Sequence, residues 1–395
     1  MKPWLSIIGI GEDGLQGLSV ASRCALDKAD IVFGGPRHLE LAQAGARGRP
    51  WPLPFSVEPV LACRGKRVAV LASGDPFWYG VGGTLAHHIE PDEWRAYPGV
   101  STFSLVAARL GWRLEETHCL GLHAAPFDRL AVHAADGNKV ICLVRDGAAV
   151  GELGEWLSHK GFGASQARVF EAIGGPHERS HSCEAGALAH GEFGPLVAVA
   201  LHMRGGKGRI CSSGLPDDAF DSDSQITKQP VRAVTLSMLA PRVGERLWDI
   251  GAGSGSIAIE WLLATGGRGE AIAIERRADR AARIRANGAM YGLADGLTVI
   301  EGEAPAALVG VARPDAVFVG GGASEGLLEA IWNSVPAGTR VVVNSVTMET
   351  EALLTEWSGV HGGALLRIDL AHATPLGKKR GWSPARPIVQ WSVTT

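Results

Sequence analysis

The stretch Asp249-Ile250-Gly251-Ala252-Gly253-Ser254-Gly255 follows the run Arg246–Trp248 and precedes Ile257–Ala264, which has helical apolar spacing. A strand that enters a glycine turn and then a helix suits a nucleotide, because glycine lets the backbone approach a ligand and the helix start presents free N–H groups. Glu275 stands twenty residues after Gly255, at the end of the next apolar run. A carboxylate there can accept from both hydroxyls of an adenosine ribose.

The spacing of these glycines distinguishes between cofactors. They follow G-x-G-x-G and not G-x-G-x-x-G, because Ser256 occupies the later position. That spacing favours S-adenosylmethionine (SAM) over a dinucleotide, since no pyrophosphate has to be held. The alternative is a tight turn followed by a surface glutamate.

A second, unlike glycine loop, Gly9–Gly14, follows the apolar run Leu5–Ile8. Its G-x-G-x-x-G spacing also fits a dinucleotide fingerprint, which expects an acid at the end of the next strand. Asp30 instead precedes Ile31–Phe33, and glycines follow that run. Because the two loops differ in spacing and flanks, we expect two separate cofactor sites and a bifunctional enzyme.

Composition limits the classes of protein. A chain of 395 residues suits two or three domains, and its net charge of −3 gives no electrostatic case for nucleic acid or a membrane surface. The sequence shows no signal-peptide pattern and no apolar run near the roughly 18 residues of a membrane span. The six scattered cysteines include no Cys-x-x-Cys pair, which favours reduced, mostly buried thiols in a cytoplasmic protein.

Apolar β-branched runs alternate with Ala/Leu-rich helical stretches, which predicts βαβ units and mainly parallel sheets. The expected strands are Leu5–Ile10, Ile31–Phe33, Arg67–Ala72, Lys139–Val144, Pro195–Leu201, Arg246–Ile250, Ala271–Glu275, Ala316–Val319, Arg340–Val343 and Pro387–Val393. Residues 205–224 are rich in glycine, serine and acid and form the candidate linker between domains 1–204 and 225–395. A softer break is expected at Gly111–Glu116.

The C-terminal half resembles the class I methyltransferases, a Rossmann-like fold, and within them the decarboxylating precorrin methylase domain. The segments that carry the resemblance are Gln225–Lys228, Asp249–Ser256, Glu301–Pro305, Asp315–Gly322 and Val343–Thr347. Related domains usually have Thr where Ser254 stands. The resemblance implies that Gly321 and Asn344 face substrate, and that the cofactor touches Thr227, Gly251, Gly253, Gly255, Glu275, Glu303 and Ala304.

The N-terminal half resembles the tetrapyrrole methylases, a class III fold with SAM in a cleft between two α/β lobes. Its marks are Ser73-Gly74-Asp75-Pro76 and Pro98-Gly99-Val100-Ser101, together with Gly35–Leu39. The general family has Pro where Glu12 stands, whereas the precorrin-6B branch opens much as Gly9–Gly14 does. The resemblance implies cofactor contacts from Gly9, Gly11, Ser73, Gly74, Asp75, Pro76, Ser101 and Thr102.

The fused order of the domains resembles the bifunctional precorrin methylases. That resemblance implies methylation of precorrin-6B at carbons 5 and 15 and loss of the ring C acetate carboxyl, giving precorrin-8, with carbon 5 assigned to the first domain. Methyl transfer is an in-line displacement that needs alignment more than a strong base, which agrees with the absence of a visible Ser-His-Asp or Cys-His pattern. The implied polycarboxylate substrate makes Arg37, His38 and Lys378-Lys379-Arg380 candidate clamps, with solvated charges as the alternative.

Other interpretations remain open at this point. A nicotinamide-linked oxidoreductase, an RNA or protein methyltransferase with an N-terminal targeting module, and a SAM-sensing module each fit part of the pattern. His177, His181 and Cys183 would share a face if helical, but no fourth ligand stands nearby, so we expect no metal. Trp78 or Trp382 could stack on a macrocycle, although packing suits most tryptophans. We expect a homo-oligomer, with transient contacts to neighbouring corrin-pathway enzymes.

Overall fold

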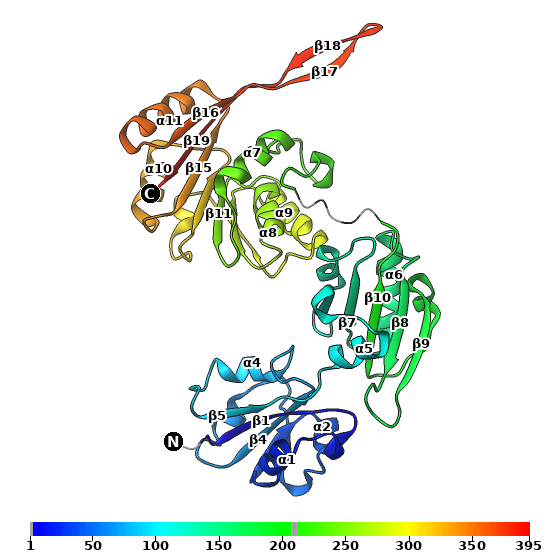
Figure 1. Ribbon diagram of the computed structural model, residues 1–395. Helices are drawn as coiled ribbons and strands as arrows, with labels where there is room; N and C mark the ends of the chain where they lie inside the picture. Colours follow the sequence, from blue (N-terminus) through cyan, green and yellow to red (C-terminus); the bar gives the residue numbers. More distant parts are fainter. Residues whose placement is uncertain (1–2, 207, 209, 211) are drawn as a thin grey trace. The chain divides into compact units, whose positions relative to one another are not determined.

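The computed structural model describes residues 3–206, 208, 210 and 212–395, and Figure 1 shows its helices and strands. The chain forms two compact units. Unit 1 comprises Met1–Phe127 and His133–Gly208, and unit 2 comprises Asp128–Val132 and Arg209–Thr395. Both units alternate strands with helices, which confirms the predicted α/β class.

The first sheet of unit 1 is parallel throughout, in the order β3-β2-β4-β1-β5. Leu5 and Ile7 of β1 enter the core on one face, and Ile8 and Ile10 enter the core on the other. A strand buried on both faces reads as a continuous apolar run, so the sequence predicted it. The strands are β1 (Leu5–Ile10), β2 (Ile31–Gly34), β3 (Gly48–Pro50), β4 (Val68–Ser73) and β5 (Trp94–Tyr97). The helices are α1 (Val20–Asp27), α2 (Pro36–Leu41), α3 (Glu58–Leu61) and α4 (Val81–Ala86).

The second sheet of unit 1, in the order β6-β7-β10-β8-β9, is mostly antiparallel, so the prediction of mainly parallel sheets is wrong here. Only the pair β6 and β7 is parallel among its described strands. The short connection between β8 and β9 carries no helix, so the chain returns as a hairpin. The elements are β6 (Thr117–Gly121), β7 (Lys139–Leu143), β8 (Gln166–Glu171), β9 (Arg179–Glu184), β10 (Val197–His202) and α6 (Gly147–His159).

Helix α5 (Thr102–Leu110) belongs with the second sheet. Its buried residues Phe103 and Val106 pack against Ile141 and Ala198 of that sheet. The chain therefore changes lobe before α5, in the segment 98–101, and not at Gly111–Glu116 as predicted. The physical reason is the apolar face of α5, which needs the second sheet to cover it.

The sheet of unit 2 has the order β13-β12-β11-β14-β15-β19-β16, with β19 antiparallel to both of its neighbours and the central strands parallel. Val317 and Phe318 of β14 again enter opposite cores. The strands are β11 (Arg246–Ile250), β12 (Glu270–Glu275), β13 (Leu297–Glu301), β14 (Ala316–Val319), β15 (Arg340–Ser345), β16 (Ala364–Ile368) and β19 (Ile388–Thr394). The helices are α7 (Gln229–Leu239), α8 (Ser256–Ala264), α9 (Ala278–Met290), α10 (Glu325–Ser334) and α11 (Met348–His361).

The later part of the predicted linker 205–224 packs into unit 2. Leu215 and Phe220 lie in its core, 5% and 4% exposed. A buried ion pair holds this segment: Arg232 Nε donates to Glu260 Oε1 at 2.5 Å. Glu260 also accepts from Gly214 N–H at 2.6 Å and from Leu215 N–H at 2.9 Å. Because these donors satisfy a buried carboxylate, residues 214–220 are a fixed part of unit 2.

An antiparallel hairpin, β17 (Ala371–Leu376) with β18 (Lys379–Pro384), projects from unit 2 beyond β16 and β19 (Figure 1). Its residues are exposed, including Leu376 at 70% and Trp382 at 78%. A two-stranded ribbon of this kind gains no stability from a core of its own.

The composition predicted mostly buried cysteines and no membrane-spanning segment. Cys142 is buried, but Cys24 is exposed and Cys63, Cys119 and Cys183 are half-buried, so the expectation of mostly buried thiols is wrong for these five free cysteines. Cys211 lies outside the described residues. No helix in the described part of the chain combines the length and apolar character that crossing a bilayer requires.

Candidate functional site

The glycine-rich motifs of unit 1 meet at one edge of its first sheet. Because β1, β2, β4 and β5 are parallel, their carboxyl ends lie together, and a motif follows each of them. Gly74 N–H donates to Ile10 O at 3.1 Å, and Gly99 N–H donates to Gly74 O at 2.9 Å. The backbone itself therefore joins loops that are far apart in the sequence.

Gly9 has a steric role at this edge. It is a buried residue of β1, and a Cβ atom built on it would lie 1.7 Å from Gly74 O and 2.5 Å from Gly99 N. Glycine is therefore required because three backbones approach one another here, and not because the turn needs an unusual φ. Gly9 sets the spacing of the loops that surround the candidate site.

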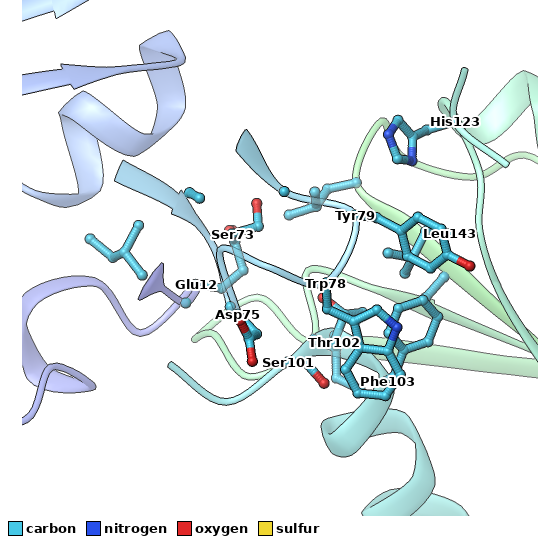
Figure 2. A pocket seen from close by; sticks show the side chains of 18 of the residues that line it. Glu12, Ser73, Asp75, Trp78, Tyr79, Ser101, Thr102, Phe103, His123 and Leu143 are labelled. Atoms are coloured by element: carbon cyan, nitrogen blue, oxygen red, sulfur yellow. The ribbon is translucent and has the colours of Figure 1, made fainter. Parts of the chain in front are cut away.

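A pocket of about 340 Å³ lies beside these loops, with walls from both sheets of unit 1. Figure 2 shows part of its lining. The predicted site residues that line it are Gly11, Arg37, His38, Ser73, Gly74, Asp75, Ser101 and Thr102. Gly9 and Pro76 are buried and shape the loops instead. The Asp75 carboxylate accepts from Phe77 N–H at 2.9 Å, and Ser101 Oγ accepts from Ser104 N–H at 3.1 Å, so both also fix local turns.

Three aromatic side chains form one wall of the pocket, and only Trp78 among them was a candidate from the sequence. Trp78 lies over Phe103 with ring centroids 4.7 Å apart, and Tyr79 lies 5.9 Å from the same ring. In Figure 2 these rings face the side of the pocket that carries Ser73 and Asp75. Trp78 and Tyr79 stand two and three residues after the Ser-Gly-Asp-Pro motif, so their position in the sequence could have pointed to both. Phe103 could be placed only from the packing of α5.

A polar cluster of four side chains lines the pocket between β1, β2 and β4. Arg37 forms an ion pair with Glu12, and its Nη2 donates to Ser73 Oγ at 2.9 Å. His38 Nε2 lies 2.8 Å from Ser73 Oγ and 3.1 Å from Arg37 Nη2. Burial, with the nearby Arg37 charge, lowers the pKa of His38 to about 4, so the imidazole is neutral. Arg37 is thus already paired and is not a free carboxylate clamp.

In unit 2 the second glycine loop lies at the carboxyl edge of β11 and is bonded to the end of β12. Gly251 and Ala252 donate their N–H groups to Ile274 O at 3.0 and 3.1 Å. Glu275 is 4% exposed; its Oε2 accepts from Gly253 N–H at 2.9 Å and its Oε1 from Arg277 N–H at 3.0 Å. Each carboxylate oxygen keeps a second lone pair for a ligand hydroxyl.

Most other predicted residues of unit 2 come to the same edge. A Cβ on Gly251 would lie 3.0 Å from Gly321 O, and a Cβ on Gly253 would lie 3.3 Å from Gln225 O, next to the Thr227 segment. Thr227 is fixed through its carbonyl, which accepts from Arg232. The loop after β13 joins the edge through Gly302 N–H, which donates to Glu275 O at 3.0 Å. Glu303 and Ala304 follow in that loop.

Asn344 differs from the expected picture of a side chain turned toward substrate. Its residue is 8% exposed, and its Nδ2 donates to Thr235 Oγ1 at 3.0 Å. Its Oδ1 accepts from Gln390 Nε2 at 2.8 Å. The amide is therefore held inside the domain by α7 and β19.

Two buried polar atoms beside the glycine loop have no partner. Asp249 is 1% exposed and its Oδ2 accepts from Ala258 N–H at 3.0 Å, whereas its Oδ1 is unbonded, as is Ser254 Oγ. Burial raises the pKa of Asp249 to about 7. Unsatisfied acceptors, a bonded ribose-type carboxylate and a loop of left-handed glycines together fit a cationic nucleoside such as SAM.

Family profiles match both units. The profile of tetrapyrrole (corrin/porphyrin) methylases matches residues 5–189, and that of the precorrin methyltransferase domain matches residues 218–395. A precorrin-6Y C(5,15)-methyltransferase (decarboxylating) from Sinorhizobium sp. is 48% identical over 402 residues, which cover 100% of this chain and 97% of the relative. The chain belongs to this precorrin methyltransferase family. The resemblance and the fold class predicted from the sequence are confirmed, and the oxidoreductase, RNA or protein methyltransferase and sensor interpretations are removed.

Shorter relatives of the precorrin methyltransferase family have single activities in their names. A probable cobalt-precorrin-6B C(15)-methyltransferase (decarboxylating) from Saccharolobus solfataricus is 34% identical over 35% of this chain and 71% of the relative. A cobalt-precorrin-7 C(5)-methyltransferase from Salmonella typhimurium is 30% identical over 45% of this chain and 89% of the relative. Among solved structures, the C-terminal domain of a Rhodobacter capsulatus precorrin-6Y C5,15-methyltransferase is 52% identical, with 47% of this chain and 100% of that chain covered and a TM-score of 0.46.

The remaining candidate residues lie away from the two sheet edges that carry the glycine loops. His181 and Cys183 lie on strand β9, so the helical face that a His177–His181 metal pair requires is not formed. The described residues contain no group of His, Cys, Asp and Glu side chains arranged to hold a metal ion. Lys378-Lys379-Arg380 lies at the turn of the β17–β18 hairpin, and the exposed Trp382 lies further along β18, opposite Ala373.

Proposed function

We propose that this chain methylates carbons 5 and 15 of precorrin-6Y (precorrin-6B) and removes the ring C acetate carboxyl as CO2, giving precorrin-8. Unit 1 methylates carbon 5, and unit 2 decarboxylates and methylates carbon 15. The observation that carries this proposal is a chain with two separate glycine-loop edges that is similar along its whole length to a C(5,15)-methyltransferase. The existence of shorter, single-activity relatives for carbons 5 and 15 supports the division.

In unit 1 the pocket suits the alignment step. SAM supplies an electrophilic methyl group, and the loops after β1, β4 and β5 would hold it. The aromatic wall of Trp78 and Phe103 offers a flat apolar surface for a macrocycle. With the ring carbon, methyl and sulfur in line and water excluded, the reaction gains mainly from proximity.

In unit 2 the candidate residues would hold SAM by its charged and ribose ends. Glu275 accepts from ribose hydroxyls, while Asp249 and Ser254 offer their unbonded oxygens beside the loop. Gly320–Gly322 is exposed beside Gly251 and gives the macrocycle close access to the loop. The electrons that decarboxylation releases pass into the conjugated imine of the macrocycle, so this chain has to orient the acetate and exclude water.

We further propose a cytoplasmic homo-oligomer whose substrate is a polycarboxylate tetrapyrrole, in transient contact with neighbouring corrin-pathway enzymes, with no nucleic acid or membrane partner and no metal. The exposed apolar side chains Leu376 and Trp382 of the hairpin support association between copies, because a solvated ribbon has no core to bury them.

The test uses full-length variants and SAM with a ¹³C-labelled methyl group. Gly74→Ala disturbs unit 1, because its Cβ would meet Ser101 Cα at 2.9 Å and its φ is +55°. Gly251→Val disturbs unit 2, where φ is +71° and the Cβ would meet Gly321 O at 3.0 Å. NMR of the product of Gly74→Ala should show no label at carbon 5. The product of Gly251→Val should carry no label at carbon 15 and should keep the ring C acetate carboxyl. Loss of the carbon 15 label in the unit 1 variant would reverse the assignment.

A further inference from the structure

The polar cluster Glu12, Arg37, His38 and Ser73 has an internal order of donors and acceptors. Arg37 can only donate, so its Nη2, 3.1 Å from His38 Nε2, requires an unprotonated nitrogen there. The Ser73 hydroxyl must then donate to His38 Nε2 at 2.8 Å, while Ser73 Oγ accepts from Arg37 Nη2 at 2.9 Å. One lone pair of Ser73 Oγ remains, and Ser73 is an exposed residue of the pocket wall.

The carbon 5 reaction creates a need for a proton acceptor. When a ring carbon attacks the SAM methyl group, the C–CH3 bond forms, the S–CH3 bond breaks and its electrons stay on sulfur. The positive charge moves from sulfur to the macrocycle, and a proton must leave the methylated ring system to restore neutrality. A positioned base that takes this proton accelerates such a step.

We propose that Ser73 and His38 are the proton-accepting pair of unit 1, in which Ser73 Oγ takes the proton from the methylated macrocycle as its own proton passes to His38 Nε2. The imidazolium then gives up the Nε2 proton into the pocket, because Nδ1 is buried without a hydrogen-bond partner. Ser73 is the catalytic residue, and His38 acts through it as a positioning residue. This inference rests on the proposed assignment of carbon 5 methylation to unit 1.

Arg37 and Glu12 complete the arrangement. Arg37 aligns the serine by donating to its oxygen, and it would repel an imidazolium if it stood alone. The ion pair between Arg37 and Glu12 places a carboxylate against that charge and so reduces the repulsion. Burial and the Arg37 charge lower the pKa of His38 to about 4, which keeps Nε2 unprotonated at neutral pH and makes the imidazolium short-lived.

The experiment measures carbon 5 methylation by the full chain in single turnovers. Ser73→Ala, His38→Ala and His38→Gln are expected to slow it about 100-fold or more. Methylation of carbon 15 should stay within about threefold of the parent in all three variants, and so should binding of S-adenosylhomocysteine in the two His38 variants, a range well below that effect. Added imidazole should restore most of the rate to His38→Ala. Thermal unfolding of each variant establishes that unit 1 remains folded.

His88→Ala is the matched control, because His88 is an exposed histidine of the same lobe outside the pocket lining. Carbon 5 methylation by His88→Ala should proceed at the parent rate, and added imidazole should leave that rate unchanged. Unchanged carbon 5 methylation in His38→Ala would overturn the proposal, and so would a slow variant that imidazole does not rescue, because that result leaves His38 a purely structural role.

A further variant tests the assignment of carbon 5 methylation to unit 1 separately from the role of Ser73 and His38. Gly9→Ala displaces the backbone at Gly74 and Gly99 and keeps the side chains of Ser73 and His38. If Gly9→Ala loses S-adenosylhomocysteine binding in unit 1 and still methylates carbon 5, the assignment of that reaction to unit 1 fails. If Gly9→Ala loses the reaction while Ser73→Ala and His38→Ala keep it, the assignment stands and the proton-accepting pair is overturned.

Discussion

Replacing Gly9 by alanine is expected to stop methyl transfer in unit 1 and leave unit 2 active. The new Cβ would lie 1.7 Å from Gly74 O and 2.5 Å from Gly99 N, and no rotamer change can move these backbone atoms aside. Real Cβ contacts essentially never fall below 3.0 Å, so the loops after β1 and β4 must separate by more than an ångström.

The magnitude follows from that displacement. A misplacement of about 1 Å in an alignment-dependent reaction costs about 100-fold in rate. The hydrogen bonds from Gly74 to Ile10 and from Gly99 to Gly74 are strained by the same movement. Forcing a methyl group into a packed interior costs about 1–3 kcal/mol, so unit 1 should remain folded at room temperature.

The assay is product analysis with labelled SAM, together with calorimetric titration of S-adenosylhomocysteine. We expect two binding events in the parent chain and one in Gly9→Ala, with the carbon 15 label unchanged. Gly83→Ala is the control, because its Cβ meets nothing within 4 Å and helix α4 tolerates alanine. Full carbon 5 methylation by Gly9→Ala with both binding events retained would show that the close approach of the loops does not support the site.

Other perturbations address unit 2. Glu275→Gln weakens the acceptor that holds Gly253 N–H, so S-adenosylhomocysteine affinity in unit 2 should fall about 10- to 100-fold by calorimetry, with carbon 5 methylation retained. The pKa of Asp249 is raised to about 7 in the folded state, whereas in the unfolded state it lies at about 4. Between these two pH values only the folded state keeps the proton, so the free energy of unfolding falls as pH rises from about 4 to 7. Asp249→Asn should remove that slope, worth up to about 4 kcal/mol, from urea unfolding curves measured across pH 4–8; a slope that persists contradicts the assignment. Arg232→Met leaves Glu260 buried without its cation and should destabilise unit 2 by about 3–5 kcal/mol in thermal unfolding, whereas Arg242→Met, at an exposed pair, should change stability by less than about 1 kcal/mol.

The sequence predicted the elements whose apolar pattern is complete in itself. β1, β11 and β14 were predicted to the residue, because parallel strands covered on both faces are continuous apolar runs. β8 and β9 were not predicted. β9 (Arg179–Glu184) is mostly exposed, so its sequence lacks the apolar alternation that indicates a strand. Its pairing with β8 depends on a partner that local composition does not specify.

The candidate sites divide in the same way. The glycine loops and Glu275 follow from spacing along one βαβ unit, so they were found from the sequence. The Ser73–His38 bond was not, because it depends on β2 lying beside β4 in the sheet order. Asn344 was predicted to face substrate from its motif alone, whereas its orientation is set by Thr235 and Gln390, which stand far away in the sequence.

The Arg232–Glu260 pair also determines where this polypeptide can be divided. A fragment that begins at Gln225 would keep Glu260 but lose the N–H groups of Gly214 and Leu215 that bond to its carboxylate. The severed piece would carry an under-bonded charge on α8, the helix that follows the Gly251–Gly255 loop. A division into separately expressed genes therefore has to fall before Gly214, so that residues 214–220 stay with the C-terminal product and pack into its core.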